Sequence, residues 1–76
     1  PNPFNGVTTI GFEMAEAGKA NLTIMTVNGQ TVRNVTGEFA AGYNEIQVKD
    51  LNATGVLYYT LEANGFTATK KMIIIE

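Results

Sequence analysis

The sequence predicts an all-β domain, an antiparallel sandwich of six or seven strands. Segments rich in β-branched and aromatic residues alternate with turns that contain Gly and Asn, which is typical of sandwiches and barrels. Eight glycines divide the 76 residues so finely that no helix of about ten residues with a coherent apolar face fits between them. Hydrophobic residues make up 45% of the chain, which is enough for one core, and without cysteine no disulfide supports that core.

The alternation of apolar and polar residues places each strand and its inward face. The expected strands span residues 7–14, 20–27, 31–35, 43–48, 56–63 and 66–75. The side chains expected in the core are Ile10, Phe12, Met14, Ala20, Leu22, Ile24, Ile46, Val48, Leu57 and Leu61, with Leu51 closing one end and Phe4 tucked inward from the Pro-rich lead-in. This spacing of short strands is that of an immunoglobulin-like sandwich.

Asn28-Gly29 predicts a two-residue type I′ hairpin turn, because both central residues of that turn need positive φ. Such a turn would pair Met25 with Val32 and Ile24 with Arg33. The inward face would then slip between Ile24 and Met25, so a β-bulge is expected there.

Asn64-Gly65 is a second type I′ candidate and fixes the register of the last two strands. The core-side pairs expected across it are Leu61 with Ala68 and Leu57 with Met72; the solvent-side pairs are Thr60 with Thr69 and Glu62 with Thr67.

The composition argues against catalysis and against nucleic acid as a partner. The chain has no His and no Cys, which removes the commonest activators of acid–base and nucleophilic chemistry. Its net charge of −2 and single adjacent basic pair, Lys70-Lys71, are unlike the positive surface that phosphates require. The carboxylates Glu13, Glu16, Glu38 and Glu45 flank turns and are expected to be surface charges. No catalytic residue, cofactor or small-molecule substrate is therefore expected.

Three weaker signals have structural explanations. Asp50 and Asn52 supply too few oxygens for calcium, which takes 6–8 ligands, and are better explained as turn formers. The glycosylation sequons at Asn21, Asn34 and Asn52 are expected by chance in a domain rich in Thr and Asn. The aromatic residues Phe39, Tyr43, Tyr58 and Tyr59 could form a sugar platform, but packing is the favoured explanation.

The last strand carries the most informative segment of the chain. A basic pair precedes four apolar residues, from Met72 to Ile75. Strand physics alone favours a central strand buried on both faces. The alternative is an address read by another protein, by strand addition or by local unfolding.

Several segments, in order, resemble the C-terminal sorting domain of type IX secretion substrates. They are Pro1-Asn2-Pro3-Phe4-Asn5, Thr8-Thr9-Ile10-Gly11-Phe12, Glu16-Ala17-Gly18, Leu22-Thr23-Ile24, Asn28-Gly29-Gln30-Thr31-Val32, Ala41-Gly42, Gly55-Val56-Leu57-Tyr58-Tyr59 and Lys70-Lys71-Met72-Ile73-Ile74-Ile75. The resemblance spans essentially the whole chain. Two residues depart from it: Glu76, where a basic residue is frequent, and Leu57, where an aromatic is frequent.

The resemblance implies a non-catalytic signal, spanning residues 1–76 as one C-terminal domain of a longer secreted protein. It would pass through the periplasm and direct cargo across the outer membrane for release or surface attachment. The partners implied are the outer-membrane translocon and a sortase-like protease, and an exposed edge strand could form a weak homodimer. The residues expected to be recognised are Gly55, Lys70, Lys71, Met72, Ile73, Ile74 and Ile75.

Two other functions stay open on the residues alone. The domain could be a generic immunoglobulin-like spacer, similar to that of flagellar hook-capping proteins, which share the Pro-Asn-Pro-Phe-Asn opening. It could also be a carbohydrate-binding module of an extracellular enzyme, using Tyr43 or Tyr58.

Overall fold

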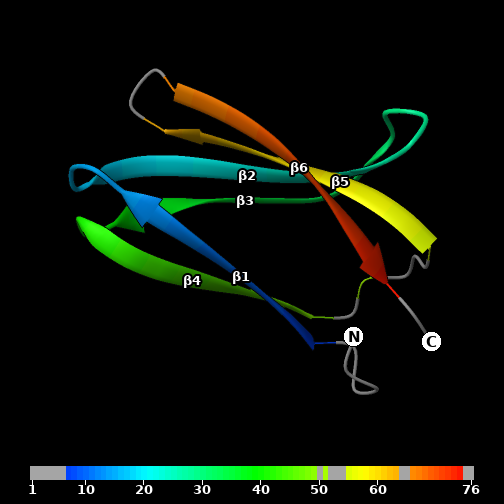
Figure 1. The fold of residues 1–76 in the computed structure, drawn as a ribbon, viewed down its shortest axis with the longest axis horizontal. Coiled ribbons are helices and arrows are strands. Elements are labelled where there is room, and N and C mark those ends of the chain that lie inside the picture. The colour runs from blue at the N-terminus through cyan, green and yellow to red at the C-terminus, as the bar shows by residue number, and fades with distance from the viewer. Residues whose placement is uncertain (1–6, 50, 52–54, 64–65, 75–76) are drawn as a thin grey trace.

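The computed structural model describes residues 7–49, 51, 55–63 and 66–74, and within them the chain forms β-strands joined by turns (Figure 1). The strands are β1 (Val7–Met14), β2 (Gly18–Thr26), β3 (Thr31–Phe39), β4 (Gly42–Lys49), β5 (Gly55–Ala63) and β6 (Phe66–Ile74). Each paired strand is antiparallel to its neighbour. The predicted all-β antiparallel architecture is confirmed. In the described part of the chain no helix is long and apolar enough to cross a membrane.

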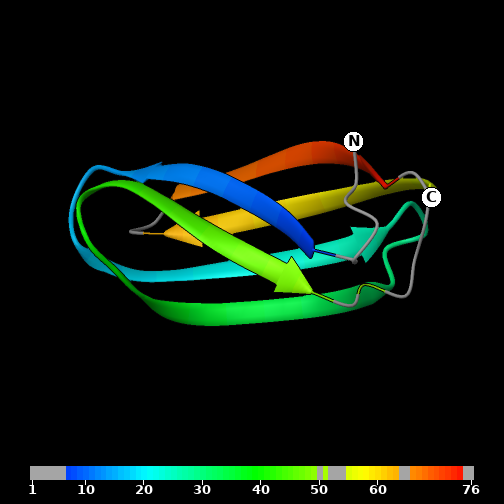
Figure 2. The same cartoon turned by 90° about the horizontal axis from the view of Figure 1, so that it is seen from below.

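The strands form two sheets that pack as layers. β1 pairs with β4, and the second sheet has the order β3-β2-β5-β6. The two-stranded sheet lies across one face of the four-stranded sheet (Figure 2). In an immunoglobulin variable-type sandwich, strands B and E are neighbours in one sheet, and strands C′, C, F and G are neighbours in the other. The order found here matches that arrangement, with no strand among the described residues at the positions of A and D.

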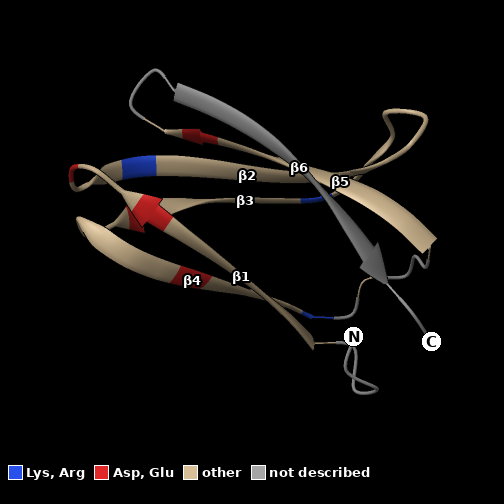
Figure 3. Ribbon diagram, viewed as in Figure 1, with Lys and Arg blue, Asp and Glu red and all other residues tan. Residues whose placement is uncertain are grey.

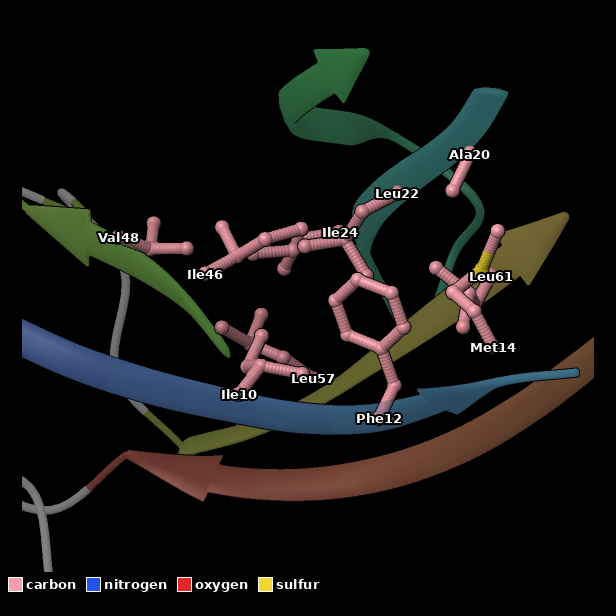
Figure 4. Packing of buried hydrophobic residues seen from close by; sticks show 10 residues of the cluster. All are labelled: Ile10, Phe12, Met14, Ala20, Leu22, Ile24, Ile46, Val48, Leu57 and Leu61. Carbon is pink, nitrogen blue, oxygen red and sulfur yellow. The ribbon is translucent and has the colours of Figure 1, made fainter. Parts of the chain in front are cut away.

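The core lies between the two layers and is wholly apolar. Its buried members are Ile10, Phe12, Met14, Ala20, Leu22, Ile24, Ile46, Val48, Leu57 and Leu61 (Figure 4). Each of these was expected from the alternation of apolar and polar residues, and no polar or charged residue is buried in the described part of the chain. Leu51 also packs against this cluster, as predicted. The expected position of Phe4 lies outside the described residues.

The predicted irregularity between Ile24 and Met25 is confirmed, but the turn beyond it differs from the prediction. The β2–β3 register shifts between these two residues, so that Ile24 pairs with Arg33 and Met25 with Thr31. The Gly29 amide donates to the Thr26 carbonyl at 2.9 Å, and the Thr26 amide donates to the Gln30 carbonyl at 2.8 Å. The loop is therefore a three-residue one.

Local hydrogen bonds explain why the chain adopts this longer loop. Thr26 Oγ1 accepts the amides of Asn28 at 3.3 Å and Gln30 at 3.2 Å, which holds the closing pair at Thr26 and Gln30. Gly29 follows the turn at φ 86°, a conformation that glycine adopts without a steric cost. The predicted pairing of Met25 with Val32 is therefore wrong by one residue, because Met25 pairs with Thr31.

The third strand is longer than predicted. Its expected end was residue 35, whereas β3 continues to Phe39. Pairing with β2 carries the strand onward, through Ala20 with Gly37 and Gly18 with Phe39. The Phe39 ring then meets the Phe12 ring edge to face, with centroids 5.1 Å apart and planes at 81°. This contact with a distant strand gives β3 an anchor that local propensity does not show.

Candidate functional site

The segments expected to carry the recognition signal lie opposite one another. β5 and β6 are antiparallel neighbours, and their register joins Gly55 with Ile74 and Tyr59 with Lys70. The three residues between pair in turn, so that residues 55–59 and residues 70–74 match one for one. We call these ten residues the signal ladder.

The signal ladder brings together six of the seven residues predicted for recognition. Gly55 pairs with Ile74, and residues 70–73 lie on the same strand as Ile74, although 14 residues lie between Gly55 and Lys70 in the sequence. Ile75 lies outside the described residues. The predicted register of these strands is confirmed: Leu61 pairs with Ala68, Leu57 with Met72, Thr60 with Thr69 and Glu62 with Thr67. The same register places residues 55–59 beside residues 70–74, which was not among the predictions.

Gly55 has a backbone role at the start of the ladder. Its φ is +89°, and a Cβ built at this position would meet nothing within 4 Å. The requirement for glycine is therefore conformational, because a residue with a side chain is strained at this φ even where space is free. The residues beyond it are extended: Leu57 is buried in the core, while Tyr58 and Tyr59 are half-buried.

Away from the signal ladder, the outer face of the four-stranded sheet carries a network of hydrogen-bonded polar side chains. Asn34 Nδ2 donates to Thr23 Oγ1 at 2.9 Å and to Asn21 Oδ1 at 3.0 Å. Thr36 Oγ1 donates to the same Asn21 oxygen at 2.6 Å, and Asn21 Nδ2 donates to Glu62 Oε1 at 3.3 Å. The amides of both described sequon asparagines, Asn21 and Asn34, thus donate to neighbouring side chains.

Tyr43 is the most exposed aromatic side chain of the described chain, at 63%. It projects from the outer face of the β1–β4 sheet, where it stands opposite Glu13 in the register. Its Oη donates to Glu45 Oε2 at 3.1 Å, and this hydrogen bond to a carboxylate is the main cause that raises the pKa of Tyr43 above its ordinary value. The ring lies over Gly11, where an added Cβ would clash with Oη and stand 2.8 Å from Cζ.

Replacing Gly11 by alanine is expected to displace the Tyr43 ring while leaving the domain folded. The ring is the exposed end of a side chain, so it can lift away with a change in the free energy of unfolding of about 0.5 kcal/mol or less. Because the hydrogen bond to Glu45 is then lost, the pKa of Tyr43 should fall toward its ordinary value, as NMR titration of the ring would show. Glu45→Gln is the matched control, since it removes the charge without moving the ring. An unchanged Tyr43 titration in Gly11→Ala would contradict this placement.

The remaining predicted surface residues have no arrangement suited to metal or acid–base chemistry. Glu13, Glu16, Glu38 and Glu45 are exposed, as expected. Within the described ranges there is no group of three or more His, Cys, Asp or Glu that could hold a metal ion. Asp50 and Asn52 lie outside those ranges. Phe39 packs against the core, as was favoured over a sugar-binding role, and Tyr59 does the same.

Comparison with known proteins gives the family of this chain. No curated protein and no solved structure is significantly similar to it. The family model described as the secretion system C-terminal sorting domain matches residues 1–75, nearly the whole chain. Its β-fold, its ordered motifs and the pairing of the last two motifs agree with this match. The chain belongs to the family of secretion system C-terminal sorting domains, the sorting signals of type IX secretion.

Proposed function

We propose that the secretion machinery recognises this domain through the signal ladder. The recognised segment consists of Lys70, Lys71 and the apolar residues Met72, Ile73, Ile74 and Ile75. Gly55 supplies the positive-φ backbone at the start of the opposite strand. The observation that carries the proposal is the one-for-one pairing of residues 55–59 with residues 70–74. Two motifs that lie apart in the sequence form a single two-stranded element, so one partner could contact both at once.

The finer steps of the pathway form part of the same proposal. The domain forms the C-terminal part of a longer exported protein, residues 1–76 being one unit. It crosses the periplasm, presents the ladder to the outer-membrane translocon and is then removed by a sortase-like protease. The cargo is released or attached to the cell surface. The role in this scheme is that of an address, so the domain needs no catalytic group.

Fusion of residues 1–76 to a fluorescent protein in a host with type IX secretion tests the proposal. The fusion is expected to leave the cell or reach its surface, and its tail is expected to be cut. A fusion that accumulates in the periplasm with the tail intact would overturn the proposal. The same fusion without residues 70–76 is the control for export that does not depend on the signal.

The double variant Lys70→Ala, Lys71→Ala is expected to reduce export while the domain stays folded. The change removes two charges but keeps the apolar residues and the backbone ladder between β5 and β6. The free energy of unfolding is therefore expected to stay close to that of the wild type. Thermal melting and secretion assays on the same variant separate the two effects. Wild-type export by the double variant would remove the lysines from the proposed signal.

Carbohydrate binding is the second candidate, and one observation favours it. Tyr43 lies over Gly11 with most of its surface exposed, beside the carboxylate of Glu45. An aromatic ring next to hydrogen-bonding groups is the arrangement on which a sugar ring can stack. Affinity electrophoresis on a panel of polysaccharides tests it. A loss of mobility that Tyr43→Ala abolishes would support this function, and unchanged mobility on every polysaccharide would dismiss it.

A further inference from the structure

The outer face of the β1–β4 sheet carries an exposed aromatic ring between two carboxylates. In the register, Tyr43 is opposite Glu13, and in the next outward row Glu45 is opposite Gly11. The Tyr43 ring lies over Gly11, so it crosses this square of four residues along one diagonal. Glu13 and Glu45 occupy the other diagonal, one on each side of the ring. We call Glu13, Tyr43 and Glu45 the Tyr43 cluster.

The contact with Gly11 explains where the ring lies but leaves most of it accessible. An aromatic side chain placed over a glycine is a device that covers the backbone of an edge strand. Tyr43 nevertheless stays 63% exposed. The hydrogen bond from its Oη to Glu45 Oε2, at 3.1 Å, holds the phenol end in place. The ring is therefore a positioned and exposed aromatic surface beside a carboxylate.

The two carboxylates of the Tyr43 cluster are not neutralised from their own sheet. Diagonal positions on paired strands are about 7–8 Å apart, so the charges of Glu13 and Glu45 repel each other. Lys49, the one basic residue of β1 and β4, is four residues beyond Glu45. That is about 13 Å along the strand, further than the screening length of about 8 Å at physiological ionic strength. A cation held over the ring would relieve the repulsion.

The charge around the cluster is negative. Figure 3 shows acidic residues on both strands of this sheet and a basic residue only at the far end of β4. Lys19, on β2, is opposite Glu38 in the other sheet. The pKa of Tyr43 is raised first by its hydrogen bond to Glu45, then by desolvation and by the negative charges of Glu45 and Glu13. A partner complementary to this surface is therefore positively charged.

The chemistry of the cluster favours an arginine side chain over an uncharged sugar. A guanidinium is attracted to the face of an aromatic ring within about 6 Å of its centre. It is also planar and donates to carboxylates through a fork of N–H groups. The ammonium of lysine is more strongly hydrated and does not stack in this way. A neutral sugar would stack on the ring but would leave both negative charges uncompensated.

We infer that the Tyr43 cluster is a docking site for an arginine-bearing segment of a protein partner. The guanidinium stacks on the exposed face of the Tyr43 ring and lies between the carboxylates of Glu13 and Glu45. The site belongs to the two-stranded sheet, whereas the signal ladder belongs to the other layer. The inference therefore goes beyond the proposed function and does not rest on it.

Titration of the 76-residue chain with a short peptide that contains two arginines among glycines tests the inference. In NMR spectra, saturable shifts of the Tyr43 ring signals and of the β1 and β4 amides are expected. The matched peptide with two lysines should bind about threefold more weakly, because it keeps the charge but lacks the planar group. Binding of both peptides should weaken as the salt concentration rises.

Variants separate the ring from the charges. Tyr43→Leu keeps an apolar cover over Gly11 but removes the aromatic face, and Glu13→Gln and Glu45→Gln each remove one charge. Each of the three should weaken binding of the arginine peptide about threefold. Glu38→Gln is the matched control, because it removes an equal charge from an exposed strand position of the other sheet. It should bind like the wild type, and thermal melting confirms that every variant is folded.

Three outcomes would overturn the inference. The first is the absence of saturable shifts with the arginine peptide. The second is equal weakening by Glu38→Gln, since binding would then follow the net charge and not this site. The third is retardation by an uncharged polysaccharide that Tyr43→Leu abolishes and Glu13→Gln leaves unchanged, which would assign the ring to a sugar. None of these measurements involves export, so each outcome leaves the proposed role of the signal ladder standing.

Discussion

Replacing Ile24 by alanine is expected to lower the free energy of unfolding by about 2–5 kcal/mol. Ile24 is fully buried in β2, the strand that pairs with both β3 and β5. Alanine would leave a cavity at the centre of the four-stranded sheet, and the strands on either side restrict its collapse. A single domain of this size has only a few kcal/mol of stability in total, so the variant should be largely unfolded at moderate temperature.

Chemical denaturation of the wild type and Ile24→Ala checks this expectation. Leu61→Ala, on β5, should cost a similar amount, because Leu61 is buried in the same cluster and pairs with Leu22 across the sheet. Thr23→Ala is the matched control, since Thr23 is next to Ile24 but half-buried on the outer face. A loss of less than 0.5 kcal/mol for Ile24→Ala or Leu61→Ala would mean that the assigned core face is wrong.

Replacing Phe12 by alanine is expected to cost about 3–5 kcal/mol, the largest effect of a single truncation in this domain. Phe12 is the largest side chain of the buried cluster, and it links the layers. It comes from β1, in the two-stranded sheet, and its ring meets Phe39 of β3, in the four-stranded sheet. Its removal therefore weakens the contact that holds the two sheets together.

A double-mutant cycle with Phe39→Ala separates the ring contact from the loss of buried area. If the edge-to-face geometry contributes, the two truncations should be coupled by about 0.5–1.5 kcal/mol. Denaturation of the two single variants and the double variant gives this coupling. Strictly additive losses would mean that the rings do not interact beyond burial, and would also contradict the contact as the reason why β3 extends to Phe39.

The register of the last two strands shows how far sequence reasoning reaches when a turn is short. Ala63 and Phe66 are direct partners, so two residues connect β5 and β6, as Asn64-Gly65 predicted. Once the loop length is known, every later pair follows by counting. The turn between β2 and β3 shows the limit of the same method. Asn28-Gly29 gave the same signal, but the backbone amides of Asn28 and Gln30 donate to Thr26 Oγ1 and the loop is one residue longer. Met25 therefore pairs with Thr31 and not with Val32.

The candidate site was predictable as residues and not as a surface. Lys70, Lys71 and the apolar run after them stand out in the sequence, and so does Gly55 through its motif. That these segments pair one for one depends on the register of β5 and β6. This register was predicted, but its consequence for the site was not.

The sequence by itself determined the class of fold, the strands and nearly all of the core, because period-two alternation and turn chemistry are local properties of the chain. Only the tertiary structure decided which strands share a sheet, how far β3 runs and which side chains meet on the outer face. Those features depend on contacts between residues far apart in the sequence, such as Phe12 with Phe39 and Met25 with Tyr58. No local pattern encodes the energy of such contacts, which exists only once the strands that carry the two residues are assembled.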